Sequence, residues 1–268
     1  MRIKLKPRQK TSHKGENGTV LIIGGSEDYI GAPALVGMAA LATLKSGADL
    51  VTVAAPEKVA WTINCIAPDI ITKKIRCANF TPKNVNEVLK LAESADVVEI
   101  GNGIAFTPGA KEFIQQTIKK LSGKLVIDAA ALRAIRIQDV KNAVLLPHAG
   151  ELKELLKNSK LKDAQKHLDN NILVKKGHPK TIIMSKTKTI TSTAGNAGMT
   201  HGGTGDVLAG IISALIAQGN DPFMAAYTAV QVNGKAAEIL YKKMGFGYLA
   251  SDLVKTIPTV LKKFQKIK

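Results

Sequence analysis

Short apolar runs alternate along this chain with segments of helical periodicity, and this alternation limits the folds open to it. Thr19 to Ile23 is a β-branched and apolar run that ends at Gly24-Gly25-Ser26. Residues 32–45 then place small and apolar side chains at helical spacing, and residues 50–54 form a second apolar run. A strand, a helix and a second strand in this order are typical of parallel sheets. The sequence therefore predicts an α/β fold, with helices on both faces of a mainly parallel sheet.

The same pattern continues through the rest of the chain. We expect further strands at residues 96–100, 125–128, 143–146, 172–174 and 181–184, with 189–192 as a hairpin partner. We expect further helices at 108–121, 150–157, 204–218, 222–243 and 251–263, with Thr204 as the cap of the third, Gly219 at its end, and Ser251 and Asp252 at the start of the last. Because no linker, repeat or change in composition divides the chain, we expect a single domain over residues 1–268.

Charge and composition exclude several classes of protein. The net charge of +17 comes mostly from Lys residues spread along the chain, and aromatic residues make up only 4%. A nucleic-acid-binding surface would interleave basic and aromatic residues, so we expect a solvated basic surface that attracts small anions, with no nucleic-acid partner. The basic N-terminus lacks the apolar core of a signal peptide, and the longest apolar run, residues 207–217, is too short to span a membrane. We therefore expect a cytoplasmic protein with no membrane partner.

Residues 195–206 read Gly-Asn-Ala-Gly-Met-Thr-His-Gly-Gly-Thr-Gly-Asp and lead into an apolar helix. The three glycines Gly202, Gly203 and Gly205 leave the backbone bare where the N–H groups of the first helical turn point at an anion. No Lys-Ser/Thr pair follows the glycines, so this is not a Walker A loop. Asp206 stands at the mouth of this expected phosphate site. It can cap the helix, but its place directly after the glycines favours a general base beside a moving phosphoryl group.

Polar residues and glycines follow several of the expected strands. In a parallel sheet these strand ends share one edge, where ligands bind, so they predict a long composite cleft. Three side chains there have both a functional and a structural interpretation: His148 as a ligand contact or a loop histidine, Asp128 as a functional acid or a turn former, and Glu151 as a metal ligand or a helix start. The strand ends are Gly24-Gly25-Ser26, Gly101-Asn102-Gly103, Asp128, Pro147-His148-Ala149-Gly150-Glu151 and Lys176-Gly177.

Several blocks in order resemble the ADP/ATP-dependent NAD(P)H-hydrate dehydratase family of the ribokinase-like superfamily. The glycine–Asp block is shared with sugar and thiazole kinases of that superfamily, whereas the His-Lys-Gly and Pro-His-Ala-Gly-Glu blocks are more specific. The resemblance implies a ribokinase-like three-layer α/β/α fold with a mainly parallel central sheet. The blocks are His13–Gly18, Val20–Ser26, Tyr29–Pro33, Lys45–Ala48, Leu146–Glu151, Asn196–Gly210 and Ser251–Leu253.

The resemblance implies a repair reaction, in which the hydrated S-form of NADH or NADPH (NADHX or NADPHX) is dehydrated at the expense of ADP or ATP. Phosphorylation turns the ring hydroxyl into a good leaving group, and elimination of phosphate restores the reduced ring. Asp206 would be the general base, Mg²⁺ would bridge phosphate oxygens, and Glu151 is a candidate metal ligand. The hydrated cofactor would contact Ala32, Gly103, His148 and Asp206. The nucleotide would contact Lys176, Gly177, His178, Pro179, Lys180, Asn196, Gly202, Gly203, Thr204 and Gly205.

The chain also departs from the family pattern. The usual Asp-Ala-Asp-Ala-Leu run reads Asp128-Ala129-Ala130-Ala131-Leu132, and the Gly-Pro-Gly-Leu-Gly loop is reduced to residues 101–105. The epimerase domain often fused to this family is expected to be a separate protein or absent. We expect a homo-oligomer, with a tetramer favoured, and the small-residue helix 32–42 as one surface for a neighbour. The alternative function is a small-molecule kinase of the same superfamily, acting on a thiazole or hydroxymethylpyrimidine.

Overall fold

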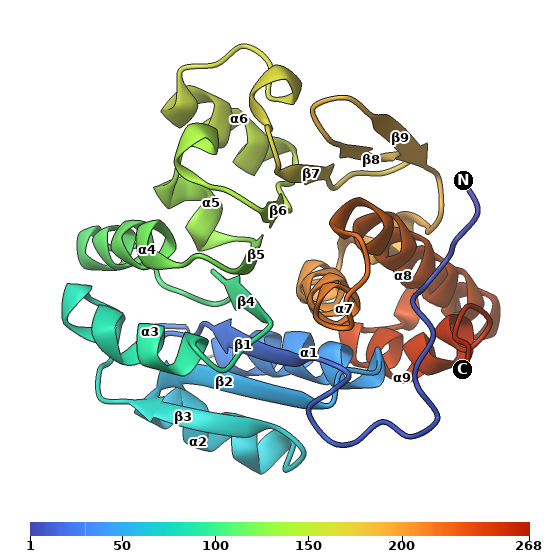
Figure 1. The fold of residues 1–268 in the computed structure, drawn as a ribbon, viewed down its shortest axis with the longest axis horizontal. Helices are drawn as coiled ribbons and strands as arrows, with labels where there is room; N and C mark the ends of the chain where they lie inside the picture. The colour runs from blue at the N-terminus through green and yellow to red at the C-terminus, as the bar shows by residue number, and fades with distance from the viewer. Residues whose placement is uncertain (30) are drawn as a thin grey trace.

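The computed structural model describes residues 1–29 and 31–268, leaving out the side chains of Ala32 and Pro33. One nine-stranded sheet runs through the molecule in the order β3-β2-β1-β4-β5-β6-β7-β8-β9 (Figure 1). β1 to β7 are parallel, and β8 and β9 form the antiparallel hairpin that the sequence predicts. The strands are β1 (Thr19–Ile23), β2 (Leu50–Pro56), β3 (Ile71–Ile75), β4 (Val97–Ile100), β5 (Lys124–Ile127), β6 (Ala143–Leu145), β7 (Ile172–Lys175), β8 (Thr181–Met184) and β9 (Thr189–Ser192).

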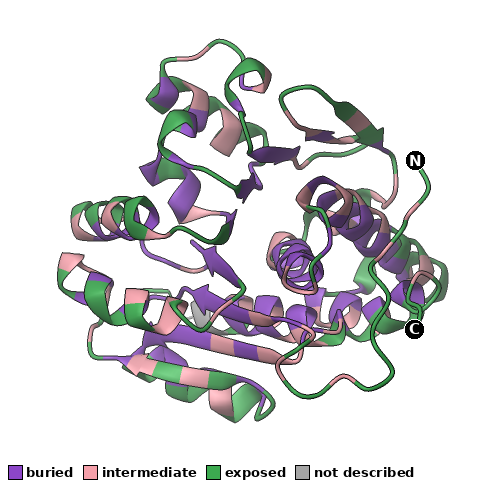
Figure 2. Cartoon of the chain, viewed as in Figure 1, coloured by how far each residue is buried: buried purple, intermediate pink, exposed green. Residues whose placement is uncertain are grey.

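Helices cover both faces of the sheet, as predicted, because alternate strand residues point to opposite sides. In β1, Val20 and Ile22 join one hydrophobic core, while Leu21 and Ile23 join the other. Buried residues accordingly concentrate in the strands and in the central helix α7 (Figure 2). One face carries α1 (Ala32–Lys45), α2 (Glu57–Ile66), α7 (Thr204–Ala217), α8 (Pro222–Met244) and α9 (Ala250–Leu261), and the other carries α3 (Val85–Ala92), α4 (Pro108–Lys120), α5 (Ala130–Ala134) and α6 (Ala149–Ser159).

The side of the sheet on which successive strands are added changes between β1 and β4. The chain builds β2 and β3 on one side of β1, and β4 then pairs on the other side. The two loops that leave these strands are tied together, since the N–H of Gly25 donates to the carbonyl oxygen of Asn102 at 2.9 Å. Gly24 has no room for a side chain, because a Cβ there would meet the same carbonyl oxygen. Such a switch point is where open α/β sheets place their ligands.

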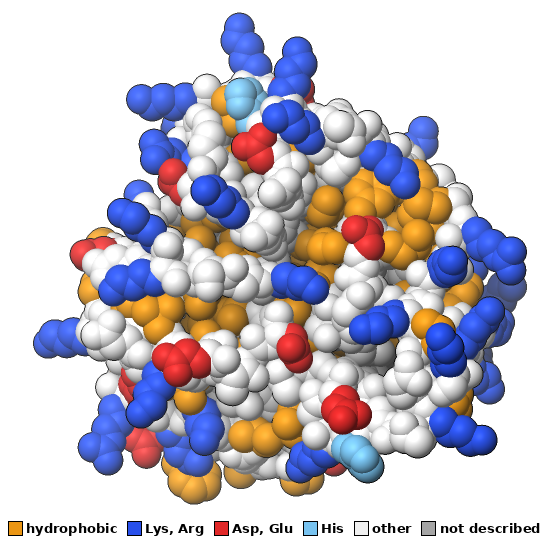
Figure 3. Space-filling model, viewed as in Figure 1, with side chains coloured by type: hydrophobic (Ala, Val, Ile, Leu, Met, Phe, Trp, Pro, Cys, Tyr) orange, Lys and Arg blue, Asp and Glu red, His pale blue; other side chains and the backbone are white. Residues whose placement is uncertain are grey.

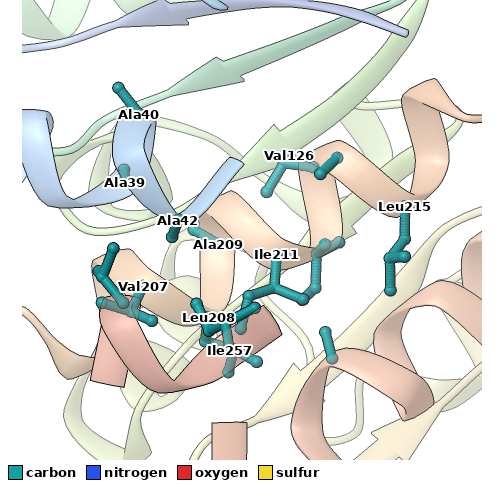
Figure 4. Close-up of a cluster of buried hydrophobic side chains, with 14 of the residues drawn as sticks. Ala39, Ala40, Ala42, Val126, Val207, Leu208, Ala209, Ile211, Leu215 and Ile257 are labelled. Atoms are coloured by element: carbon teal, nitrogen blue, oxygen red, sulfur yellow. The ribbon is translucent and has the colours of Figure 1, made fainter. Parts of the chain in front are cut away.

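Helix α7 is held in place by close packing on α1. Gly210 of α7 lies against the backbone of Ala39, and a Cβ at Gly210 would meet the Ala39 carbonyl oxygen. Figure 4 shows the small side chains of Ala39 and Ala42 beside Ala209 in this contact. Ala39, Ala40 and Ala42 of the small-residue helix 32–42 are therefore buried inside the protein and are not available to a neighbouring molecule.

Where elements were predicted, their boundaries mostly fall within about two residues of the prediction, and α7 begins at Thr204 as predicted, but Thr204 is not its cap. The residue before the helix is Gly203, with a left-handed φ of 89°, and Thr204 is the first helical residue. The Thr204 hydroxyl donates to the carbonyl oxygen of Met199 at 2.8 Å, so it does not cap the helix. Gly219 follows the end of α7 with a φ of 82°, as predicted. α9 begins at Ala250, where Asp252 accepts a hydrogen bond from the N–H of Leu249.

Basic side chains are scattered over the surface. On the face seen in Figure 3, Lys and Arg side chains lie all around the outline and do not gather in one patch. This agrees with the spread of Lys along the sequence. Within the described ranges, no helix combines the length and apolar character needed to cross a membrane.

Candidate active site

The first turn of α7 opens at the carboxyl edge of the sheet, where its N–H groups are available to an anion. The Val207 N–H donates to the Gly203 carbonyl oxygen and the Thr204 N–H donates to the His201 carbonyl oxygen at 3.4 Å, so the first turn offers the N–H groups of Gly205 and Asp206 to an anion. Gly205 carries no side chain at this point, and a Cβ there would lie 3.4 Å from Lys176 Nζ. The bare backbone, the helix dipole and the Lys176 ammonium therefore converge on one place suited to phosphate.

The Asp206 carboxylate lies in the same turn and is held by the switch-point loop. Asn102 Nδ2 donates to Asp206 Oδ1 at 2.8 Å. Burial raises the pKa of the Asp206 carboxyl group to about 6, and the nearby Asp128 carboxylate adds to this rise, while the Asn102 hydrogen bond and Lys176 oppose it. A carboxylate whose pKa is this close to neutral is a better proton acceptor than an ordinary aspartate and is still ionised at neutral pH.

A partly buried lysine links three strand ends around this carboxylate. Lys176, which directly follows β7, places Nζ 2.6 Å from Asp128 Oδ1 and 3.8 Å from Glu151 Oε2. Burial alone would lower the pKa of Lys176, but the two carboxylates outweigh it and hold the pKa above its ordinary value. Lys176 is therefore a fixed positive charge beside the first turn of α7.

His148 and Glu151 form the start of α6. His148 Nδ1 accepts hydrogen bonds from the N–H groups of Gly150 and Glu151, and Glu151 Oε2 accepts one from the N–H of His148. This capping box satisfies the free donors of the helix, which supports the structural interpretation of both residues. Because Nδ1 is an acceptor, the neutral His148 ring carries its proton on Nε2. The His148 side chain is 60% exposed, so it remains accessible to a ligand.

A cavity of about 380 Å³ adjoins the first turn of α7, between β7, β8 and α8. Two amide groups in its wall have unused hydrogen-bonding atoms among the described residues, the Nδ2 of Asn196 and the Oδ1 of Asn233. Tyr248 holds Asn196 in place, because its hydroxyl donates to Asn196 Oδ1 at 2.6 Å. The cavity is lined by His148, Lys176, Gly177, His178, Thr181, Ala194, Asn196, Met199, Thr200, Thr204, Gly205, Leu208, Val230 and Asn233.

The structure brings many of the predicted site residues together. Six residues predicted to bind the nucleotide line this cavity: Lys176, Gly177, His178, Asn196, Thr204 and Gly205. Four do not line it: Pro179, Lys180, Gly202 and Gly203. Among those predicted to contact the hydrated cofactor, His148 lines the cavity, Gly103 follows Asn102 at the switch point, and the Ala32 side chain lies outside the described part of the chain.

Sequence reasoning missed several residues of the site. Asn102 is among the strand-end residues expected in the cleft, but its pairing with Asp206, 104 positions away, was missed, because only the strand order brings the two side chains together. Asn233 lines the cavity and Tyr248 contacts Asn196 in its wall, both from the C-terminal helical region, which carries no local motif for them. Outside the site, an acidic residue inside an apolar strand is a sequence signal that was also passed over: Glu99 lies in β4, where it is fully buried.

The described residues do not form a metal site in which every ligand comes from the protein. No three His, Cys, Asp or Glu side chains gather as ligands anywhere in residues 1–29 and 31–268. At the position of the family's second acid, Ala130 packs on the hydrophobic core beneath α5. The donor set therefore fits only a metal such as Mg²⁺, which binds through one or two carboxylates, water and the phosphates of a substrate.

The three-layer architecture and the glycine-bounded helix define a ribokinase-like protein. A ribokinase-like superfamily protein from Enterococcus faecalis superposes with a TM-score of 0.82, at 26% identity, over 98% of this chain and 93% of its own. The NAD(P)H-hydrate dehydratase from Bacillus subtilis has the same fold, with a TM-score of 0.78 at 24% identity over 97% and 95% of the two chains.

The chain belongs to the NAD(P)H-hydrate dehydratase family, whose model matches residues 20–259. An ADP-dependent (S)-NAD(P)H-hydrate dehydratase from Nitrosopumilus maritimus is 34% identical over 97% of this chain and 94% of its own length. A bifunctional NAD(P)H-hydrate repair enzyme from Pyrobaculum aerophilum is 36% identical over 96% of this chain but only 53% of its own length. The chain thus spans about half the length of several curated relatives that it matches.

Proposed function

We propose that the protein is a lyase that dehydrates the S-form of hydrated NADH or NADPH at the expense of ADP or ATP. One observation carries the proposal: the Asp206 carboxylate, its pKa raised to about 6, is fixed by Asn102 at the phosphate-suited first turn of α7. Family membership supports this chemistry, as does the ADP-dependent (S)-NAD(P)H-hydrate dehydratase that matches almost end to end.

Asp206 acts in the first of two chemical steps. It accepts the proton of the ring hydroxyl while that oxygen attacks the terminal phosphoryl group of the nucleotide, which leaves as AMP from ADP or as ADP from ATP. The N–H groups around Gly205 and the Lys176 ammonium stabilise the charge on the phosphoryl group during its transfer. Loss of such a positioned base typically costs about 10²–10⁴-fold in rate.

Elimination follows as the second step. The ring nitrogen lone pair expels phosphate from the neighbouring carbon, and a proton leaves the adjacent carbon to restore the ring double bond. The products are NADH or NADPH, phosphate and a proton. The phosphate therefore leaves from the site at which it was transferred, beside the same N–H groups and Lys176.

The cavity beside α7 suits the nucleotide. It is lined by Lys176, Gly205 and the two amides with unused hydrogen-bonding atoms. We place the adenine nucleotide there and the hydrated ring at the switch point, with Asp206 and Gly205 between them. Pro179, Lys180, Gly202 and Gly203 remain proposed contacts at the margin, while Ala32, Gly103 and His148 are the proposed contacts of the hydrated cofactor.

Magnesium is proposed as the metal, because the Bacillus subtilis dehydratase was co-crystallised with ATP and Mg²⁺. Glu151 would hold it together with nucleotide phosphates and water, and the ion would neutralise phosphate charge. The chain's own contribution is Lys176, which holds the carboxylates of Asp128 and Glu151 at this edge whether or not a metal is bound.

We further propose a cytoplasmic homo-oligomer, with a tetramer favoured, and a separate epimerase for the other hydrate epimer. Exposed apolar side chains support association: Tyr241, Met244, Phe246 and Leu249 are each 44–56% exposed around the end of α8 and the start of α9. Light scattering on the purified protein tests the oligomer, and a monomer at micromolar concentration would refute it.

The function is tested with purified protein, Mg²⁺, hydrated NADH or NADPH, and either ADP or ATP. The proposal predicts recovery of the near-ultraviolet absorbance of the reduced ring with at least one nucleotide. No recovery with either nucleotide, in protein shown to be folded, would refute it. Accumulation of a stable phosphorylated product would instead indicate the small-molecule kinase.

A further inference from the structure

Glu99 is a buried acid for which the proposed reaction has no use. It lies in the middle of the sheet with none of its surface exposed, flanked in register by Ile22 of β1 and Val126 of β5. The hydroxyl of Ser213 on α7 donates to Glu99 Oε2 at 2.6 Å. Glu99 Oε1 is buried without a hydrogen-bond partner among the residues that the structure describes. An ionised carboxylate in such a place is costly, so the group is expected to hold its proton.

The contact joins the same two segments that carry the base. Glu99 and Asn102 lie three positions apart at the end of β4, and Asp206 and Ser213 lie seven positions apart on α7, two turns along the helix. The Glu99–Ser213 and Asn102–Asp206 hydrogen bonds therefore attach α7 to β4 at two levels. The upper bond orients the carboxylate, and the lower one fixes the helix that carries it.

The charges that face Glu99 are also those of the active site. Asp206 on α7 and Asp128 after β5 are the charged groups that act on it, while its neighbours in β1 and β5 are apolar. Burial raises the pKa of Glu99 to about 8, these two acids add to the rise, and the Ser213 hydrogen bond opposes it. Ionisation of Glu99 would place a third negative charge beside Asp206 and Asp128.

We propose that Glu99 is a positioning residue for Asp206: its protonated carboxyl group, bonded to Ser213, fixes α7 on β4, and loss of that proton disturbs Asp206. This proposal rests on the proposed function for its kinetic test. It makes the neutral form of Glu99 a requirement for turnover and predicts an alkaline loss of activity set by a group that does not touch substrate.

Three variants test it by their pH profiles of kcat. Glu99→Gln keeps the shape of the neutral acid, so we expect kcat within about twofold of wild type at neutral pH and none of the decline that we expect for the wild type above about pH 8. Ser213→Ala removes the Glu99–Ser213 bond, so kcat should fall as in Glu99→Leu. Because that bond lowers the pKa of Glu99, the remaining activity should decline at a higher pH than in the wild type. Glu99→Leu should lower kcat about tenfold, with the nucleotide KM unchanged, because the base is misplaced and the cavity is intact. An identical alkaline decline in Glu99→Gln, or an unchanged kcat in Glu99→Leu, would overturn the proposal.

A second readout does not need the reaction. In protein labelled with ¹³C at aspartate carboxyl groups, the Asp206 signal is identified by its loss in Asp206→Asn. We expect this signal to titrate near pH 6 and to shift again near pH 8 in wild type, but to lack the second shift in Glu99→Gln. The same two shifts in Glu99→Gln would refute the coupling, whereas absence of dehydratase activity with the coupling present would refute the proposed function alone.

Discussion

Replacing the Asp206 carboxylate with the amide of asparagine should make the protein more stable at neutral pH. Burial raises the pKa of Asp206 from 3.8 to about 6. A pKa difference of one unit between the folded and unfolded states corresponds to about 1.36 kcal/mol. The ionised form therefore costs the folded state at most about 3 kcal/mol. Because the side chain is only partly buried, water reduces this cost, and we expect a gain of about 1–3 kcal/mol in Asp206→Asn.

The sign of the effect fixes its pH dependence. The folded protein binds the Asp206 proton more tightly than the unfolded chain does, so wild-type stability falls as pH rises from about 4 through 6. Asp206→Asn has no such proton, and its Oδ1 can still accept from Asn102. The difference in free energy of unfolding between the variant and wild type should therefore increase between about pH 4 and 6 and stay constant above about pH 7.

Urea unfolding at a series of pH values measures this difference. Asp69→Asn is the matched control, because Asp69 is exposed in the turn before β3, and we expect it to change the free energy of unfolding by less than about 0.5 kcal/mol. A variant that is no more stable than wild type at about pH 8, or a difference that does not change with pH, would refute the account of Asp206. Turnover in the same variant should fall by about 10²–10⁴-fold while nucleotide binding is retained.

Three further variants test the surroundings of the site. Lys176→Met leaves two carboxylates without their partner and should lower the free energy of unfolding by about 3 kcal/mol and weaken nucleotide binding, as measured by urea unfolding and calorimetry. Gly101→Ala should prevent folding, because Gly101 has a φ of 126° and a Cβ there would collide with the backbone oxygen of Asp128. In the control Gly123→Ala the new Cβ has open space, so the circular dichroism spectrum and the melting temperature should not change. Tyr248→Phe frees the Asn196 amide and should raise the nucleotide KM a few-fold without changing kcat, so an unchanged KM would count against the assigned cavity.

The sequence predicts the fold wherever periodicity is long or strands are apolar. The alternation around Thr19–Ile23 and the apolar pattern of residues 204–218 both correspond to elements in the structure. The region from α2 to α3 was not predicted. Residues 57–66 mix aromatic, β-branched and polar side chains, and the edge strand β3 exposes every second residue. The five-residue helix α5 is too short to show a period.

The candidate site was predictable where one short segment carries it. The glycines and Asp206 lie within a few positions, so local chemistry points to them without knowledge of the fold. Asn102 and Glu99 depend on the placement of β4 beside β1 and under α7, which is a property of topology. The sequence offered a ligand contact or a loop histidine for His148 and a metal ligand or a helix start for Glu151, but the capping box that joins them depends on side-chain geometry.

The most direct test of the central claim is the stoichiometry of the reaction in wild-type protein. With ADP as co-substrate, the proposed mechanism predicts one AMP and one phosphate for each reduced cofactor recovered, and no stable phosphorylated intermediate once the reaction is complete. Recovery of the reduced cofactor without nucleotide consumption would contradict transfer of a phosphoryl group to the ring hydroxyl. Nucleotide consumption that ends in a phosphorylated product without recovery of the cofactor would contradict elimination and favour a kinase.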